Sequence, residues 1–218
     1  MRHILLALIL VSPLALAEGP NIDKLNGAIR TESGKAYGDL ETVNGAISVR
    51  ADVEAEEVST VNGSISIDER ARVRSAEAVN GSISIERDAS VEFGVESVNG
   101  GISLRQGARV GGSVETVNGS LKLRGAEVQG DLSNVNGSIT VDEGSFVHGG
   151  ITVKKSKGWN FWGDSNSKPP RVTIGANSVV KGTLMFEREV ELEVHPTAKI
   201  GPLKGVTPIR IDAQTVEK

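Results

Sequence analysis

A seven-residue phrase, VNGSISI in its commonest form, recurs along the chain and limits the folds open to it more than any other feature. Its asparagine occupies seven positions: Asn26, Asn44, Asn62, Asn80, Asn99, Asn118 and Asn136. The intervals between successive asparagines are 18, 18, 18, 19, 19 and 18. A fixed period of this kind, about 20 residues long, is typical of a solenoid, in which each coil buries its apolar side by stacking on its neighbours.

The apolar residues within one period indicate strands and not helices. Pairs such as Ile47 with Val49, or Ile65 with Ile67, have the i, i+2 spacing of a strand. Further apolar residues recur three positions before the valine of the phrase and ten to twelve positions after it. Three apolar segments per period predict three short strands and three corners. We therefore expect an all-β fold, a single-domain parallel β-solenoid or triangular β-helix, in which each interval of the phrase makes one coil.

The Asn-Gly step of the phrase lies between two inward-pointing residues and is expected to form a corner. Glycine adopts positive φ without strain and asparagine tolerates it, which makes Asn-Gly a strong turn signal. Parallel coils stack about 4.8 Å apart, so each asparagine is expected directly above the next. Stacked amides can hydrogen-bond to one another along the stack. The seven asparagines are thus predicted to form a structural ladder along one edge of the solenoid.

The strand pattern continues beyond the last copy of the phrase. Val172 with Ile174, Val190 with Leu192, and Ile209 with Ile211 repeat the apolar pair at spacings of 18 and 19, which gives about ten coils in residues 18–218. Opposite charges are also expected to pair between coils. The predicted pairs are Arg50 with Asp68, Glu86 with Arg105, Arg124 with Asp142, Arg171 with Glu189, and Glu191 with Arg210.

Residues 154–171, KKSKGWNFWGDSNSKPPR, replace the corner phrase in one coil. This segment contains both tryptophans of the chain, Trp159 and Trp162, with Phe161 between them. Long loops in compact domains are commonly functional, and exposed aromatic rings are favoured contact residues. Two interpretations remain open. The rings fold back over the edge of the solenoid, or they form a binding patch for an envelope protein or a glycan.

Residues 1–17 have the features of a secretory signal peptide. A basic start is followed by the apolar run from Ile4 to Val11 and by the small-residue site Ala15–Ala17, so cleavage is expected after Ala17 and the product is expected in the periplasm or outside the cell. No stretch has the roughly 20 apolar residues of a membrane span. The chain has no cysteine and a net charge of −4, which argues against disulfides and against nucleic acid as a partner.

Residues with catalytic or metal-binding chemistry are few, and we expect no enzyme, cofactor or metal. His148 and His195 lie more than two periods apart without a catalytic or metal-ligand spacing. Glu77, Glu96 and Glu115 take one corner position in successive coils, where a polysaccharide-cleaving enzyme or a cation site would need them to act. The simpler interpretation is that they lie in solvent. A row of hydroxyls that includes Ser48, Ser66, Ser84 and Ser103 is likewise expected to be a solvated face.

The signal peptide and the repeated VNGSISI phrase resemble a bacterial exported repeat family described as an adhesin domain of unknown function. The resemblance covers about residues 21–153 and implies a β-solenoid, without catalytic residues to transfer. The later stretch VTIGANSVVKGTLMF is similar to bactofilins, triangular β-helix proteins that polymerise in the cytoplasm. The expected function is that of an exported, non-enzymatic structural or binding protein. Self-association as an envelope scaffold and polysaccharide cleavage are the alternatives.

Overall fold

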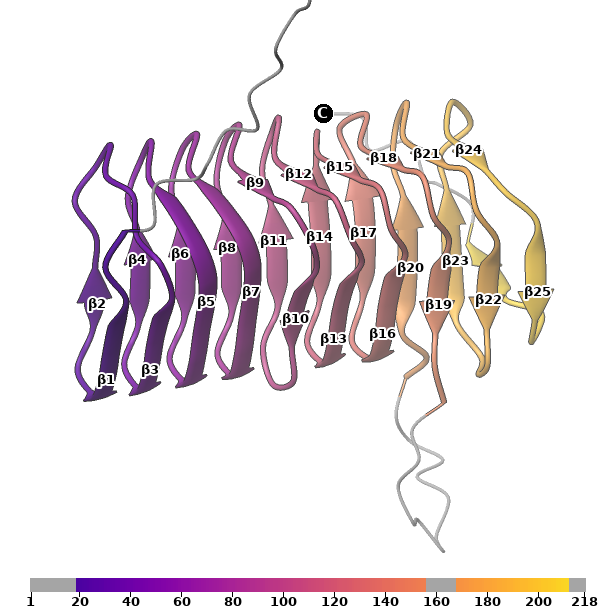
Figure 1. The fold of residues 1–218 in the computed structure, drawn as a ribbon. Coiled ribbons are helices and arrows are strands. Elements are labelled where there is room, and N and C mark those ends of the chain that lie inside the picture. The colour runs from indigo at the N-terminus through magenta and orange to yellow at the C-terminus, as the bar shows by residue number, and fades with distance from the viewer. Residues whose placement is uncertain (1–18, 156–167, 212–218) are drawn as a thin grey trace, which may run out of the picture.

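The computed structural model describes residues 19–155 and 168–211, which form one parallel β-solenoid (Figure 1). One sheet has ten strands, one from each coil. They are β2 (Ile29–Arg30), β4 (Ile47–Val49), β6 (Ile65–Ile67), β8 (Ile83–Ile85), β11 (Ile102–Leu104), β14 (Leu121–Arg124), β17 (Ile139–Asp142), β20 (Arg171–Ile174), β23 (Glu191–Val194) and β26 (Ile209–Ile211). The predicted all-β solenoid of about ten coils is confirmed.

The second sheet has sixteen strands in two rows. The first row leads into the Asn-Gly corners and consists of β1 (Ile22–Asn26), β3 (Leu40–Asn44), β5 (Glu54–Asn62), β7 (Arg72–Asn80), β10 (Val95–Ser97), β13 (Val114–Asn118), β16 (Leu132–Asn136), β19 (Ile151–Val153), β22 (Leu184–Phe186) and β25 (Leu203–Gly205). The short row consists of β9 (Ser90–Val91), β12 (Arg109–Val110), β15 (Glu127–Val128), β18 (Phe146–Val147), β21 (Val179–Val180) and β24 (Lys199–Ile200). The nine-residue strands β5 and β7 run through both rows and join them.

The core consists of columns of like residues, one from each coil. In the ten-stranded sheet, Ile47, Ile65, Ile83 and Ile102 stack in register, and each is at most 1% exposed. Burying one such side chain contributes about 1.5–3 kcal/mol. Because each side chain contacts its counterparts above and below, the repeated sequence itself supplies the complementary packing surface.

One inward column has a hydroxyl in four coils and fastens each of these coils to the one before it, whereas Ala78 takes the same place in β7. Thr42, Thr60, Ser97 and Thr116 are all nearly buried. Each hydroxyl donates a hydrogen bond to the carbonyl of the corner glycine in the preceding coil, at 3.2, 3.0, 2.9 and 2.9 Å respectively. The corner carbonyls of Gly27, Gly45, Gly81 and Gly100 therefore have side-chain partners.

The predicted asparagine ladder is present along the whole set of seven residues. Each side-chain amide from Asn44 onward donates to the Oδ1 atom of the asparagine in the preceding coil, at distances of 2.8 to 3.0 Å. The last oxygen, Oδ1 of Asn136, accepts a hydrogen bond from Nη1 of Arg188 at 3.3 Å. Arg188 thus continues the ladder past the coil that contains residues 154–171.

The reason for glycine at these corners differs from the predicted one. Positive φ occurs only at Gly27 and Gly137 among the seven corner glycines. At the other five, a Cβ atom would lie within 2.2 Å of the carbonyl oxygen of the corner glycine below, so close approach of the coils excludes any side chain. Positive φ occurs instead at another corner, where Asp52, Arg70 and Asp88 have φ near 60°.

The predicted register is wrong near the C-terminus. Val172 and Ile174 pair with Leu192 and Val194, so Val190 lies in the corner, where it is buried. The corner after Phe186 is longer than the Asn-Gly corners: six positions separate Phe186 from Leu192, whereas five separate the equivalent Thr42 and Ile47. In the last coil Ile209, which was expected to point inward, pairs with Glu191 and is 47% exposed.

Two of the five predicted charge pairs are confirmed and three are not. Arg171 pairs with Glu191 at 3.0 Å and not with Glu189, and Arg210 lies beside Leu192 and not beside Glu191. Arg124 lies beside Asp142 in register, but its ion pair is with Glu143 at 4.0 Å. The pairs between Arg50 and Asp68 at 3.5 Å, and between Arg105 and Glu86 at 4.0 Å, are confirmed.

Candidate functional site

The valine of the repeated phrase points outward, away from the core. Val43, Val61, Val79, Val98 and Val117 are between 38% and 42% exposed. Because the strands of the first row are parallel and in register, these five residues form a continuous apolar line along the solenoid, here called the valine stripe. Leu25, 69% exposed, extends it at one end, and Val135 extends it at the other. A continuous exposed apolar surface is typical of an interaction site.

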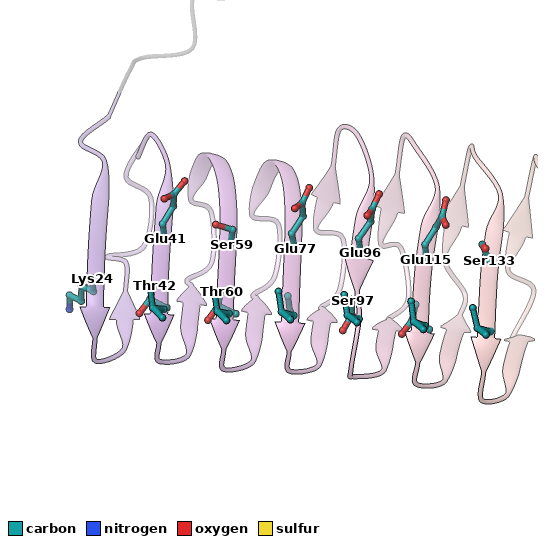
Figure 2. Close-up of a pocket in the computed structure, with 18 of the residues that line it drawn as sticks. Lys24, Glu41, Thr42, Ser59, Thr60, Glu77, Glu96, Ser97, Glu115 and Ser133 are labelled. Carbon is teal, nitrogen blue, oxygen red and sulfur yellow. The ribbon is translucent and has the colours of Figure 1, made fainter. Parts of the chain in front are cut away.

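A row of acidic residues runs beside the valine stripe, two positions earlier in each strand. We call Glu41, Glu77, Glu96 and Glu115 the glutamate column; Ser59 takes the equivalent place in β5. Glu77, Glu96 and Glu115 were predicted to stack at a corner. They do stack in register, but they lie within strands β7, β10 and β13 and not at a corner. In Figure 2 the four glutamate side chains leave their strands in the same direction.

The valine stripe and the glutamate column line one groove of about 590 Å³. It extends from Lys24 in the first coil to Lys154 in the eighth. Figure 2 shows its lining from Lys24 to Ser133. The strands that form its floor are held by the buried column of threonine and serine hydroxyls described above. The groove is therefore built from one strand of each coil, on strands that are paired in register.

Lys154 closes one end of the groove. It follows β19 and takes the place that valine has in earlier coils. Its Nζ atom lies 3.2 Å from Oε2 of Glu115, two coils back, so the side chain crosses the coil of Ser133 and Val135. Lys154 also begins the segment that replaces the corner phrase. The groove thus ends at the base of the segment that contains Trp159, Phe161 and Trp162, and these three residues lie outside the described residues.

The other residues considered from the sequence are not brought together into a reactive group. His148 Nε2 lies 2.8 Å from Glu127 Oε1 on the short row, whereas His195 Nδ1 contacts the Thr197 hydroxyl at 2.9 Å. Within residues 19–155 and 168–211, no three His, Asp or Glu side chains are arranged to hold a metal ion. No helix in these ranges is long and apolar enough to cross a membrane.

The row of hydroxyls follows the predicted register. Ser48, Ser66, Ser84 and Ser103 stack on the outer side of the ten-stranded sheet, and Lys122 interrupts the row. These serine side chains are half-buried, whereas the groove lies on the first row of the other sheet.

Comparison of the chain with protein-family models, with curated proteins and with solved structures gives no match. The function is therefore argued from the groove and its surroundings.

Proposed function

We propose that the protein is an exported, non-enzymatic binding protein of the bacterial cell envelope, similar in its role to an adhesin. In this proposal it presents the groove, the adjacent edge with the asparagine ladder, and the segment around Trp159, Phe161 and Trp162 to one partner, an envelope protein or a glycan. The leader-like residues 1–17 support export, and the absence of cysteine is compatible with either the periplasm or the outside of the cell.

The observation that carries this proposal is the exposure of the valine stripe. An outward-facing position does not require an apolar side chain for the core to form. Each of five successive coils nevertheless has a valine there that is about 40% exposed. Polar residues at the same positions would keep the strand and its core contacts. An apolar line in a groove, bordered by charge, supports binding of a partner through burial of that line.

The experiment uses the protein without residues 1–17, immobilised and exposed to fractionated envelope material. Saturable capture of one component is expected, and the double variant Trp159→Ala/Trp162→Ala should reduce it at least tenfold with an unchanged melting temperature. The control is Tyr37→Phe, which alters an aromatic residue at the far end of the solenoid. Capture that is equal for the double variant and the wild type would remove the Trp segment from the proposal.

Self-assembly is the second candidate, and the last coil supports it. Strands β25 and β26 each pair on one side only within the described residues, and Val206 and Ile209 are 44% and 47% exposed. Unpaired strand edges can pair with another chain. Light scattering of the same preparation distinguishes the two candidates: mass that grows with protein concentration favours a scaffold, whereas a constant monomer mass favours the binding protein.

A further inference from the structure

The groove is too large in volume to be filled by the same face of a second copy of this chain. If two copies of this chain met through their valine stripes, the roughly 590 Å³ of each groove would be left between them. Unfilled volume at an apolar contact forfeits the dispersion energy of the atoms that line it. A slender occupant that lies along the solenoid axis fills the groove and reaches the valines.

The charge of the groove selects a cationic occupant. Four glutamates stand beside the stripe, and Asp23 continues their column in the first coil. A neutral or anionic glycan would leave these carboxylates without a counter-charge, and it would have to dehydrate them. An occupant with both aliphatic and ammonium groups would satisfy the valines and the glutamates together.

Lys154 makes a contact of this kind within the chain itself. Its ammonium group lies on Glu115, and its aliphatic portion crosses the line of the stripe at the coil of Val135. Lysine side chains commonly lay their methylene groups on apolar surface while the charged end stays in water or on an acid. Lys154 therefore shows how a lysine from another chain would lie in the same groove further along.

The spacing of the glutamates limits how such lysines are arranged. Ser59 separates Glu41 from Glu77, whereas Glu96 lies between Glu77 and Glu115. Glu41, Glu77 and Glu115, in the second, fourth and sixth coils, form a spaced set two coils apart, with Glu96 as an additional acid. Two coils rise about 9.6 Å. A polyproline II segment rises about 3.1 Å per residue with three residues per turn, so one turn rises about 9.3 Å. Side chains three residues apart on such a segment therefore meet successive glutamates of this set.

We propose that the groove binds an extended polyproline II segment of a partner protein in which lysine recurs at every third residue. The lysine ammonium groups lie on Glu41 and Glu77, and a second side of the segment places aliphatic residues on the valine stripe. Glu96, between two members of the spaced set, adds negative charge along the same line. This inference rests on the proposed function, since it names the chemistry of the partner.

The test uses two synthetic peptides of equal composition and charge: acetyl-(Lys-Val-Pro)₄-amide, and a block version in which four lysines precede (Val-Pro)₄. Binding to the protein without residues 1–17 is measured by isothermal titration calorimetry at near-physiological salt. The periodic peptide is expected to bind at least tenfold more tightly. Equal affinities would show that only net charge matters and would overturn the proposal.

Three variants locate the contact. Glu77→Gln is expected to weaken binding of the periodic peptide about two- to fivefold, as for other exposed ion pairs. Val79→Thr is expected to weaken it by about the same factor, because less apolar surface is buried. Glu189→Gln, an exposed glutamate outside the groove, is the matched control and should leave affinity unchanged. Weakening by the control equal to that by Glu77→Gln would contradict a site in the groove.

Lys154→Ala provides a gain of binding, which loss of folding cannot imitate. It frees Glu115 for a further lysine of the peptide, so affinity should rise about two- to fivefold. Lys199→Ala removes the same charge from the short row and should change affinity much less. Equal gains in the two variants would indicate a general charge effect and would count against the proposal.

The same variants separate this inference from the proposed function. If neither peptide binds, but Val79→Thr weakens capture of the envelope component, the lysine periodicity is wrong and the binding role of the groove stands. If Val79→Thr and Trp159→Ala/Trp162→Ala both leave that capture unchanged, the proposed function fails as well.

Discussion

At the scale of single residues, the corner glycines set how closely the coils approach. A Cβ atom on Gly81 would lie 1.7 Å from the carbonyl oxygen of Gly63, which is backbone and cannot rotate away. Gly34 differs, because its φ is +72° but no atom lies within 4 Å of the position of a Cβ. The two glycines therefore separate the cost of close contact from the cost of backbone strain.

Gly81→Ala is expected to destabilise the protein by about 1–3 kcal/mol or more, the range for inserted volume that cannot be accommodated. Gly34→Ala is expected to cost about 1 kcal/mol, the strain of an alanine at positive φ. Urea denaturation followed by circular dichroism gives both values. A cost for Gly34→Ala that equals or exceeds that of Gly81→Ala would contradict the account of the corners.

At the scale of an element, the inward polar column holds strands β3, β5, β10, β13 and β16 to the coil before each of them. Asn134 takes the place of threonine or serine in β16. Its Nδ2 donates to the Gly119 carbonyl at 2.7 Å, but its Oδ1 is the one buried side-chain oxygen or nitrogen without a hydrogen-bond partner in the described ranges. An unpaired buried acceptor costs about 1–3 kcal/mol.

Asn134→Thr is therefore expected to stabilise the protein by about 1 kcal/mol, because a threonine hydroxyl donates to the corner carbonyl and leaves no carbonyl unpaired. The converse change, Thr116→Asn, should destabilise it, since it would create the same unpaired oxygen in the neighbouring coil. Midpoints of thermal unfolding measure both. A rise in stability for Thr116→Asn, or a fall for Asn134→Thr, would show that the column does not act in this way.

The direction of the valine stripe could have been found from the sequence. Leu40 faces the core, and Val43 is three positions later, so in one strand the two must lie on opposite sides. Because valine is apolar, the sequence pattern alone suggested that it points inward, as Leu40 does. In contrast, the register after Phe186 could not be found, because it depends on a corner longer by one residue and on no repeated phrase. The groove follows from strand parity over many coils and could not be seen in any one repeat.

At the scale of the whole molecule, the coils with Asn-Gly corners stack in register, and that regularity makes a groove several coils long (Figure 1). The periodic sequence predicts the coil, the three strands and the asparagine ladder, because each depends on a spacing that repeats. The groove, which we propose to be the binding surface, is formed by the side chains that those coils present outward in register. The glutamate column and the valine stripe are long enough to contact an extended partner segment only because the coils stack.

The measurement that tests the binding role of the groove most directly uses a single fluorescent label, which is feasible because the chain has no cysteine. An environment-sensitive dye is attached to Val79→Cys in the groove, and in a second sample to Ser84→Cys on the ten-stranded sheet. Addition of the captured envelope component should shift the emission of the dye at position 79 to shorter wavelength and leave position 84 unchanged. A shift at position 84 alone, or none at position 79 when the partner is bound, would contradict the account.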